Sequence, residues 1–290
     1  MAKNTRLKHA SQLPIGLCLV LCMGLMSVSP VSGYAQDLEE TVCGFREAIM
    51  FWMWSNAAGS PDKARALRYP NVEAVSFTTE DGRTLRGYRI NAESSQSPSA
   101  SKGYLLVAQG NAMLADQLVE SFTRYADAGY DVYIYDYRGY GLSEGKRRLK
   151  AIVADYRQLT DSLNSLPYQK RLLYGISFGG IVILNVIGAG HAYDGAVIDS
   201  TPSRVSTYGC PVEYDPVNNL PDDGSRLMIV GGEQDRVVPI EDMEELLTEA
   251  GQRSATVVRS QEFAHPFMDR EAIHRQRMEK LKAFLLKDLD

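Results

Sequence analysis

The chain has 290 residues, of which 44% are hydrophobic, so it can bury a large core and is neither disordered nor fibrous. Its formal net charge of −5 argues against nucleic acid and against anionic membrane surfaces as partners. One α/β domain and two smaller domains are both compatible with this length.

The first 35 residues have the pattern of a secretory signal peptide. Three basic residues precede an apolar run over residues 13–28, and small residues lead to a cleavage site after Ala35. Removing three positive charges and no negative ones changes the formal net charge from −5 to −8. The alternative is an uncleaved membrane anchor, although a proline and two glycines interrupt the run. We therefore expect a secreted or periplasmic protein with no stable membrane span in its mature form.

Four cysteines are present, and two of them, Cys18 and Cys22, belong to the predicted signal peptide. Cys43 and Cys210 remain in the mature chain. In an oxidising compartment they can form one disulfide, and two unpaired buried thiols are the equal alternative. No two cysteines have the CxxC spacing of a zinc or redox site.

Residues 36–70 are predicted to form an N-terminal helical segment. Apolar side chains recur near the helical period between residues 38 and 57, which indicates an amphipathic helix. Its Met-, Phe- and Trp-rich stretch, residues 49–54, is expected to pack against the core, with an acyl channel or a lipid contact as the alternative. Strand-like runs on either side of Gly82 then predict a hairpin over residues 71–90.

From there strands and helices alternate to the C-terminus. Strands are predicted at residues 103–110, 130–136, 171–175, 195–200, 226–232 and 255–260. Helices are predicted at residues 115–128, 149–166, 178–189, 240–250 and 268–289. This alternation is typical of βαβ units, so the sequence predicts one α/β domain over residues 71–290 with a mainly parallel sheet. Active sites of such sheets lie at the carboxyl ends of the strands.

Two serines have the spacing Gly-x-Ser-x-Gly, Ser143 and Ser177. Ser177 directly follows a predicted strand and directly precedes a predicted helix, where Gly175 and Gly179 remove side chains that would collide in so sharp a turn. Its hydroxyl would project above the sheet. Ser143 lies several residues beyond the end of its strand, so we interpret it as structural. We predict that Ser177 is the nucleophile of a hydrolase, and a helix-capping serine is the alternative.

A nucleophilic serine needs a base, and three histidines remain beyond the signal peptide. His191 ends the helix that follows Ser177, and His274 falls inside the last predicted helix. His265 alone lies in a loop between a strand and a helix, at the carboxyl end of the last strand. We predict that His265 is the general base.

The histidine in turn needs a carboxylate that fixes its tautomer and stabilises its charged form. Asp235 follows the predicted strand 226–232 by a few residues and is our choice. Asp199, at the end of the preceding strand, is the main competitor, and Glu233 is a lesser one. The chain order Ser, Asp, His is the order described for α/β-hydrolases.

An oxyanion hole needs two main-chain donors. The N–H of Phe178, at the start of a helix, is one expected donor. The loop after the strand 103–110 supplies the other, for which we choose the main-chain N–H of Asn111. A plain turn without catalytic duty is the alternative interpretation of this loop.

These segments resemble the α/β-hydrolase superfamily, and more narrowly the group of BEM46-like proteins and ABHD13- and ABHD17-type serine hydrolases. The motifs are QGNA, YDYRGYGLSEG, YGISFGG, GGEQDRVVP and FAHPF. The resemblance implies an eight-stranded sheet flanked by helices, a triad of Ser177, Asp235 and His265, and an oxyanion hole at Asn111 and Phe178. This chain departs from the family by having Gln109 in place of the usual histidine before Gly110, and only a short, proline-rich lid region before Arg226.

The expected function is that of a serine hydrolase that cleaves an acyl ester through an acyl-enzyme intermediate. A peptidase or thioesterase of the same fold is the alternative, and a non-catalytic binding protein is a lesser one. We expect a small acyl substrate, with lipid as one candidate. Gly139, Gly141 and Gly145 lack the spacing of a dinucleotide-binding loop, and no cofactor or metal is expected.

Overall fold

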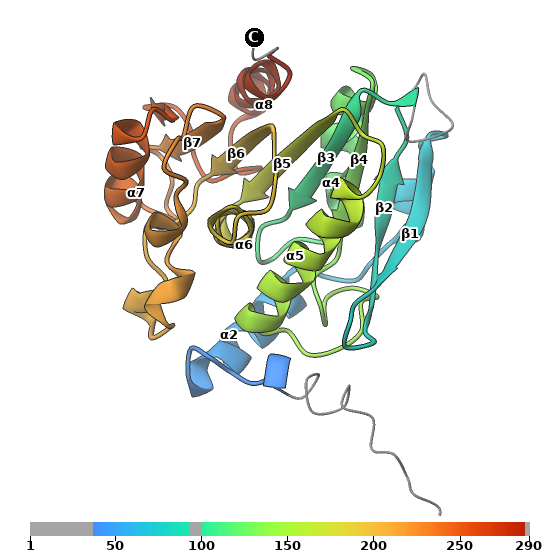
Figure 1. The fold of residues 1–290 in the computed structure, drawn as a ribbon, viewed down its shortest axis with the longest axis horizontal. Helices are drawn as coiled ribbons and strands as arrows, with labels where there is room; N and C mark the ends of the chain where they lie inside the picture. The colour runs from blue at the N-terminus through green and yellow to red at the C-terminus, as the bar shows by residue number, and fades with distance from the viewer. Residues whose placement is uncertain (1–36, 93–99, 288–290) are drawn as a thin grey trace, which may run out of the picture.

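In a computed structural model, which describes residues 37–92 and 100–287, eight strands form one sheet (Figure 1). Their order across the sheet is β1-β2-β4-β3-β5-β6-β7-β8. The strands are β1 (Val72–Thr78), β2 (Thr84–Ile90), β3 (Gly103–Ala108), β4 (Tyr130–Tyr135), β5 (Lys170–Ile176), β6 (Gly195–Asp199), β7 (Leu227–Gly232) and β8 (Thr256–Ser260). β2 runs antiparallel to both of its neighbours, and all other pairs are parallel. The predicted mostly parallel, eight-stranded sheet is confirmed.

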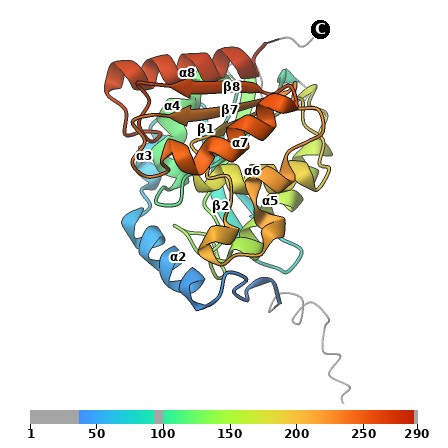
Figure 2. The same ribbon diagram turned by 90° about the vertical axis from the view of Figure 1, so that its left-hand side faces the viewer.

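Helices cover both faces of this sheet, as Figure 2 shows from the side. They are α2 (Phe45–Ala57), α3 (Lys63–Leu67), α4 (Ala115–Ala126), α5 (Leu149–Asn164), α6 (Phe178–Gly188), α7 (Ile240–Gln252) and α8 (Glu271–Leu285). α5, α6 and α7 pack on one face, and α3, α4 and α8 pack on the other. Alternate residues of each central strand point to opposite faces, so both sides of the sheet contribute to a core.

The hairpin and the alternating pattern follow the prediction closely, but the N-terminal helix does not. The predicted helix over residues 38–57 begins only at Phe45, because Gly44 has a φ of 73°, outside the helical region. The apolar stretch is also only partly packed. Phe51 is 4% exposed, whereas Trp52 is 57% and Met53 is 51% exposed. The expectation that this stretch packs against the core is therefore confirmed for Phe51 and Trp54 and wrong for Trp52 and Met53.

The region between β6 and β7, here called the cap segment (residues 201–226), is short. It contains the 3₁₀ turns η2 (Ser206–Tyr208), η3 (Val212–Tyr214) and η4 (Pro216–Asn219). A disulfide joins Cys43, just before α2, to Cys210 of this segment. The sequence left this pairing open, and the structure contains the bond.

The predicted signal peptide lies outside the described residues, and the division at residues 35 and 70 stays a prediction. Within residues 37–92 and 100–287, no helix has the length and apolar character that crossing a bilayer requires.

Candidate active site

Ser177 occupies a sharp turn between β5 and α6. Its φ of 54° is positive, which is unusual for a residue with a side chain. The flanking glycines make the turn sterically feasible: a Cβ on Gly179 would lie 1.9 Å from the carbonyl oxygen of Ala108 in β3, and one on Gly175 would lie 2.6 Å from the carbonyl oxygen of Gly179. Such strained residues persist only where the surrounding structure holds them in place, and they are frequent at active sites.

Hydrogen bonds from the neighbouring strand fix the backbone at this turn. The N–H of Ser177 donates to the carbonyl oxygen of Asp199 at 2.7 Å. The carbonyl oxygen of Ser177 accepts from the hydroxyl of Thr201 at 2.9 Å. The position of the serine is therefore coupled to the carboxyl end of β6.

Ser177 and His265 line the same cavity, whose volume is about 440 Å³. The cavity lies beyond the carboxyl ends of the parallel strands, between α2, the start of α6 and the cap segment. α2 is at the bottom of Figure 1. Apolar side chains from α2, α6 and the cap segment form much of its wall, among them Met50, Phe51, Trp54, Phe178, Ile181 and Val205.

The imidazole of His265 is hydrogen-bonded to the carboxylate of Asp235. His265 Nδ1 lies 2.8 Å from Asp235 Oδ2, and the two residues are 9% and 5% exposed. Because a carboxylate only accepts hydrogen bonds, Nδ1 carries the hydrogen, and Nε2 of the neutral ring can accept a proton. The pair therefore has the tautomer that a general base requires.

Asp235 stays ionised in this buried position. Burial by itself would raise its pKa, but hydrogen bonding and charge from His265 and hydrogen bonds from two main-chain N–H groups together lower the pKa below its ordinary value. The N–H groups of Val237 and Val238 donate to Asp235 Oδ1 at 2.8 and 2.9 Å. One carboxylate oxygen is thus held by the loop after β7, and the other is directed at His265.

The two competing acids are engaged elsewhere. Asp199 Oδ1 accepts from Arg277 at 2.9 Å and its Oδ2 accepts from the hydroxyl of Tyr174 at 3.0 Å. Glu233 pairs with Arg259 at the surface. Of the three carboxylates considered from the sequence, the structure brings only Asp235 to His265.

The loop after β3 lies against the same cavity. Gly110 and Asn111 line it, as does Phe178, whose N–H at the first position of α6 has no acceptor within the helix. Gln109, which stands where the related family usually has histidine, also fixes this loop. Its carbonyl oxygen accepts from Tyr137 at 2.6 Å, and its amide donates to the carbonyl oxygen of Met113 at 3.3 Å.

The second Gly-x-Ser-x-Gly serine joins two segments of the fold. Ser143 is 9% exposed, its hydroxyl donates to the carbonyl oxygen of Asp136 at 2.8 Å, and the same hydroxyl accepts from the N–H of Arg86 at 2.9 Å.

The two other histidines considered from the sequence do not line the cavity. His191 pairs with Asp161, and His274 packs against Phe267.

Sequence reasoning missed a buried arginine that supports the histidine loop. Arg277 Nη1 donates to the carbonyl oxygen of Ala264 at 2.8 Å and to Asp269 at 2.7 Å, and its Nη2 donates to Asp199. Asp269 also accepts from the N–H of Ala264 at 2.7 Å. The main-chain N–H and the carbonyl oxygen of Ala264, the residue before His265, are therefore both hydrogen-bonded. Arg277 lies in a highly charged helix, and nothing in the local pattern distinguishes it from its exposed neighbours.

The sheet order, the strained serine turn and the cavity at the carboxyl ends of the strands define the α/β-hydrolase fold. Residues 99–220 match the Hydrolase_4 family, described as serine aminopeptidase, S33. Among solved structures, the esterase Pf2001 of Pyrococcus furiosus superposes with a TM-score of 0.60 at 18% identity, over 78% of this chain and 95% of that one.

Two of the relatives that are similar in sequence illustrate the likeness. The uncharacterized protein YfhR of Escherichia coli K12 is 26% identical over 228 residues, which cover 72% of this chain and 79% of that protein. The polyketide transferase grgF of a Penicillium species is 33% identical over 181 residues, or 57% of this chain and 56% of that protein. The comparisons support the α/β-hydrolase superfamily, and none of them singles out the BEM46-like group.

Proposed function

We propose that the protein is a serine hydrolase that cleaves a carboxylic ester through an acyl-enzyme intermediate. One observation carries the proposal: His265, whose ring is hydrogen-bonded to the buried Asp235, lines the same cavity as a serine in a strained strand-to-helix turn. The family match and the fold of a solved esterase support hydrolase chemistry.

In this mechanism Ser177 Oγ attacks the substrate carbonyl carbon while His265 Nε2 takes the hydroxyl proton. Asp235 stabilises the imidazolium that forms. The main-chain N–H groups of Asn111 and Phe178 donate to the oxyanion. His265 then gives its proton to the leaving alcohol as the ester bond breaks, and water attacks the acyl-serine by the same steps to release the acid.

An ester fits the cavity better than the amine substrate of an aminopeptidase. Among the described residues that line the cavity, Glu47 is the only acidic one. An aminopeptidase would need a free carboxylate to bind a substrate ammonium. Both oxygens of Glu47 are occupied: Oε2 accepts from the N–H groups of Val42 and Cys43, and Oε1 accepts from that of Leu149. We therefore favour uncharged acyl esters, and expect p-nitrophenyl esters to be hydrolysed in preference to alanine p-nitroanilide.

The setting of the protein belongs to the same proposal. The disulfide supports secretion into an oxidising compartment, as the N-terminal sequence predicts. Exposed apolar residues on the outer face of α2, including Phe45, Ile49 and Trp52, support a lipid as the source of the acyl group. Sedimentation of the mature protein with phosphatidylcholine vesicles tests this, and recovery only in the supernatant contradicts it.

Labelling with a fluorophosphonate probe tests the nucleophile. The wild type is expected to react and to hydrolyse p-nitrophenyl butyrate, and Ser177→Ala is expected to do neither. Ser143→Ala is the matched control, because Ser143 is the other serine with the same glycine spacing, and it should still be labelled. Labelling of Ser177→Ala, or loss of labelling only in a well-folded Ser143→Ala, would overturn the assignment.

A further inference from the structure

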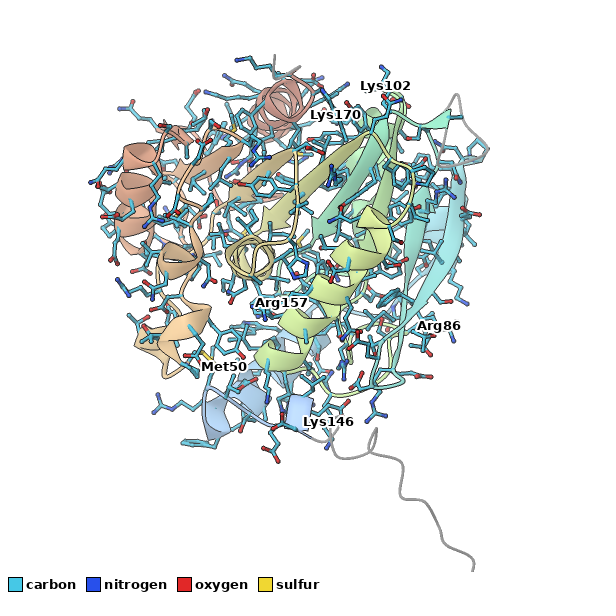
Figure 3. The ribbon with its side chains drawn as sticks, in the orientation of Figure 1. Met50, Arg86, Lys102, Lys146, Arg157 and Lys170 are labelled. Carbon is cyan, nitrogen blue, oxygen red and sulfur yellow. A yellow bond between two sulfur atoms is a disulfide. The ribbon has the colours of Figure 1, made fainter. Side chains whose placement is uncertain are left out.

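α2 lies outside the part of the chain that matches the hydrolase family, yet it forms one wall of the cavity. The match covers residues 99–220, and α2 spans Phe45–Ala57. Met50, Phe51 and Trp54 from this helix line the cavity together with residues of α6 and the cap segment. Figure 3 shows Met50 on the side of α2 that faces the body of the molecule.

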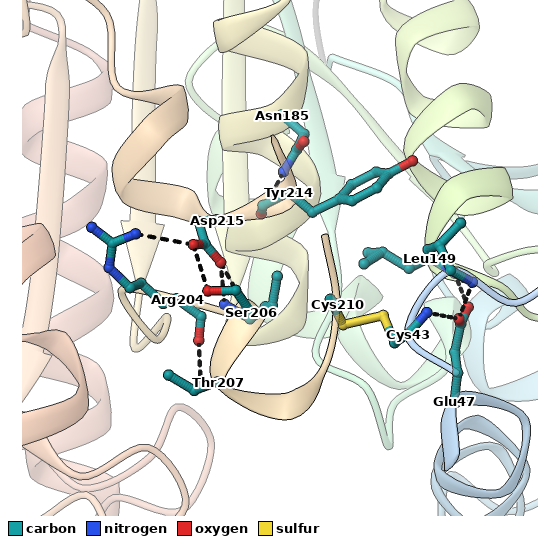
Figure 4. Close-up of a disulfide and its surroundings, with 12 residues drawn as sticks. Cys43, Glu47, Leu149, Asn185, Arg204, Ser206, Thr207, Cys210, Tyr214 and Asp215 are labelled. Atoms are coloured by element: carbon teal, nitrogen blue, oxygen red, sulfur yellow. Dashed lines mark hydrogen bonds and ion pairs between the residues drawn. A yellow bond between two sulfur atoms is a disulfide. The ribbon is translucent and has the colours of Figure 1, made fainter. Parts of the chain in front are cut away.

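The wall is fixed in place at both ends of the helix. At the N-terminal end, the disulfide joins Cys43 to Cys210, and Glu47 accepts from the N–H of Leu149 at 2.8 Å (Figure 4). At the C-terminal end, the side chain of Gln117 donates to the carbonyl oxygen of Ala58 at 2.8 Å. Cys43 and Cys210 both line the cavity, so the disulfide is part of the wall and links the start of α2 to the cap segment.

α2 also contacts the residue that follows the candidate nucleophile. The rings of Phe51 and Phe178 pack edge to face with their centroids 5.3 Å apart. The apolar surface of α2 therefore contacts the residue that follows Ser177, and Met50 and Trp54 belong to the same cavity wall. An acyl chain bound to the serine would have this surface beside it.

We propose, resting on the proposed function, that α2 is the acyl-binding wall of the site and that the substrates are esters of medium-length apolar acids. The one charged side chain among the α2 residues in the wall is Glu47, and both of its carboxylate oxygens accept hydrogen bonds from main-chain N–H groups. Burying one methylene is worth ~0.8 kcal/mol, so each methylene added to the acyl chain is expected to raise kcat/KM about fourfold until the cavity is full.

Two pairs of substitutions on opposite faces of α2 test this, with p-nitrophenyl acetate and octanoate as substrates. Met50→Trp fills the cavity and is expected to lower the octanoate-to-acetate ratio of kcat/KM by roughly tenfold or more. Met53→Trp is its control, because Met53 is 51% exposed on the outer face. Trp54→Ala enlarges the cavity and is expected to shift the preference to longer chains, whereas Trp52→Ala, on the outer face, is not.

The disulfide gives a second measurement that does not depend on a bulky substitution. In the double variant Cys43→Ser and Cys210→Ser, α2 is no longer tied to the cap segment, and the octanoate-to-acetate ratio of kcat/KM is expected to fall by roughly tenfold. Retained fluorophosphonate labelling would show that the serine is still reactive, and an unchanged octanoate-to-acetate ratio would contradict the role of the disulfide.

The outcomes separate this inference from the function on which it rests. If the wild type is neither labelled nor active, the hydrolase proposal fails, and the inference fails with it. If the wild type is active but Met50→Trp and Met53→Trp have the same chain-length preference as the wild type, the hydrolase proposal stands and the role of α2 is overturned.

Discussion

Arg277→Met should destabilise the protein strongly, because the arginine neutralises two buried carboxylates. Its guanidinium is 1% exposed, and the side chains of its partners Asp199 and Asp269 are both 0% exposed. Methionine keeps much of the side-chain volume but leaves both acids without their cation. Removing one partner of a buried ion pair costs ~3–5 kcal/mol. At roughly 2–4 °C per kcal/mol for a domain of this size, the melting temperature should fall by about 6–20 °C.

Thermal unfolding followed by circular dichroism measures this loss. The matched control is Arg124→Met, because Arg124 pairs with Glu279, whose side chain is 62% exposed, and such surface pairs are worth ~1 kcal/mol or less. Arg277→Met should also react more slowly with a fluorophosphonate well below its melting temperature, because Arg277 holds the carbonyl oxygen of Ala264. A melting temperature within about 2 °C of the wild type would refute the reasoning that these carboxylates depend on Arg277.

Three further predictions concern the acids and the serine turn. Asp235→Asn should lower kcat by about 10⁴-fold, because the amide favours the wrong tautomer of the histidine. Asp199→Asn should keep most of the wild-type kcat when it is assayed below its own melting temperature. The reverse result would exchange the roles of the two acids. Gly179→Ala should lower the free energy of unfolding, measured by urea titration, by roughly 3 kcal/mol or more, because its Cβ would lie 1.9 Å from a main-chain carbonyl oxygen. Gly251→Ala is the control: the nearest neighbour of its Cβ lies at 3.6 Å, and this substitution in a helix should raise the free energy of unfolding by up to ~1 kcal/mol. Burial raises the pKa of Asp136 from 3.8 to about 6, so the stability that its protonated form contributes is present below about pH 4 and is lost as the pH rises through 6. Asp136→Asn should therefore gain up to about 3 kcal/mol over the wild type between pH 4 and 7, and an unchanged difference would contradict this pKa.

Much of the fold and the position of the serine could be predicted from the sequence, because both depend on local patterns. Short apolar runs that alternate with segments of helical periodicity indicate strands buried between two layers of helices. The turn at Ser177 could be predicted from its glycine neighbours, because a Cβ on Gly175 would lie 2.6 Å from the carbonyl oxygen of Gly179, only four residues along the chain. A loop histidine after the last strand could be chosen for the same reason, because the carboxyl ends of parallel strands meet at one edge.

Only the tertiary structure decides which acid meets that histidine. Asp199 is the last residue of β6 and Asp235 follows β7, so both lie at the carboxyl ends of neighbouring strands and their local patterns are similar. What separates them is a partner distant in sequence: Arg277 engages Asp199, and His265 engages Asp235. Likewise, periodicity could not show which apolar residues of α2 face the cavity, because that helix is apolar on both of its faces. Local sterics act between neighbours in the chain, whereas these pairings exist only once distant segments are packed together.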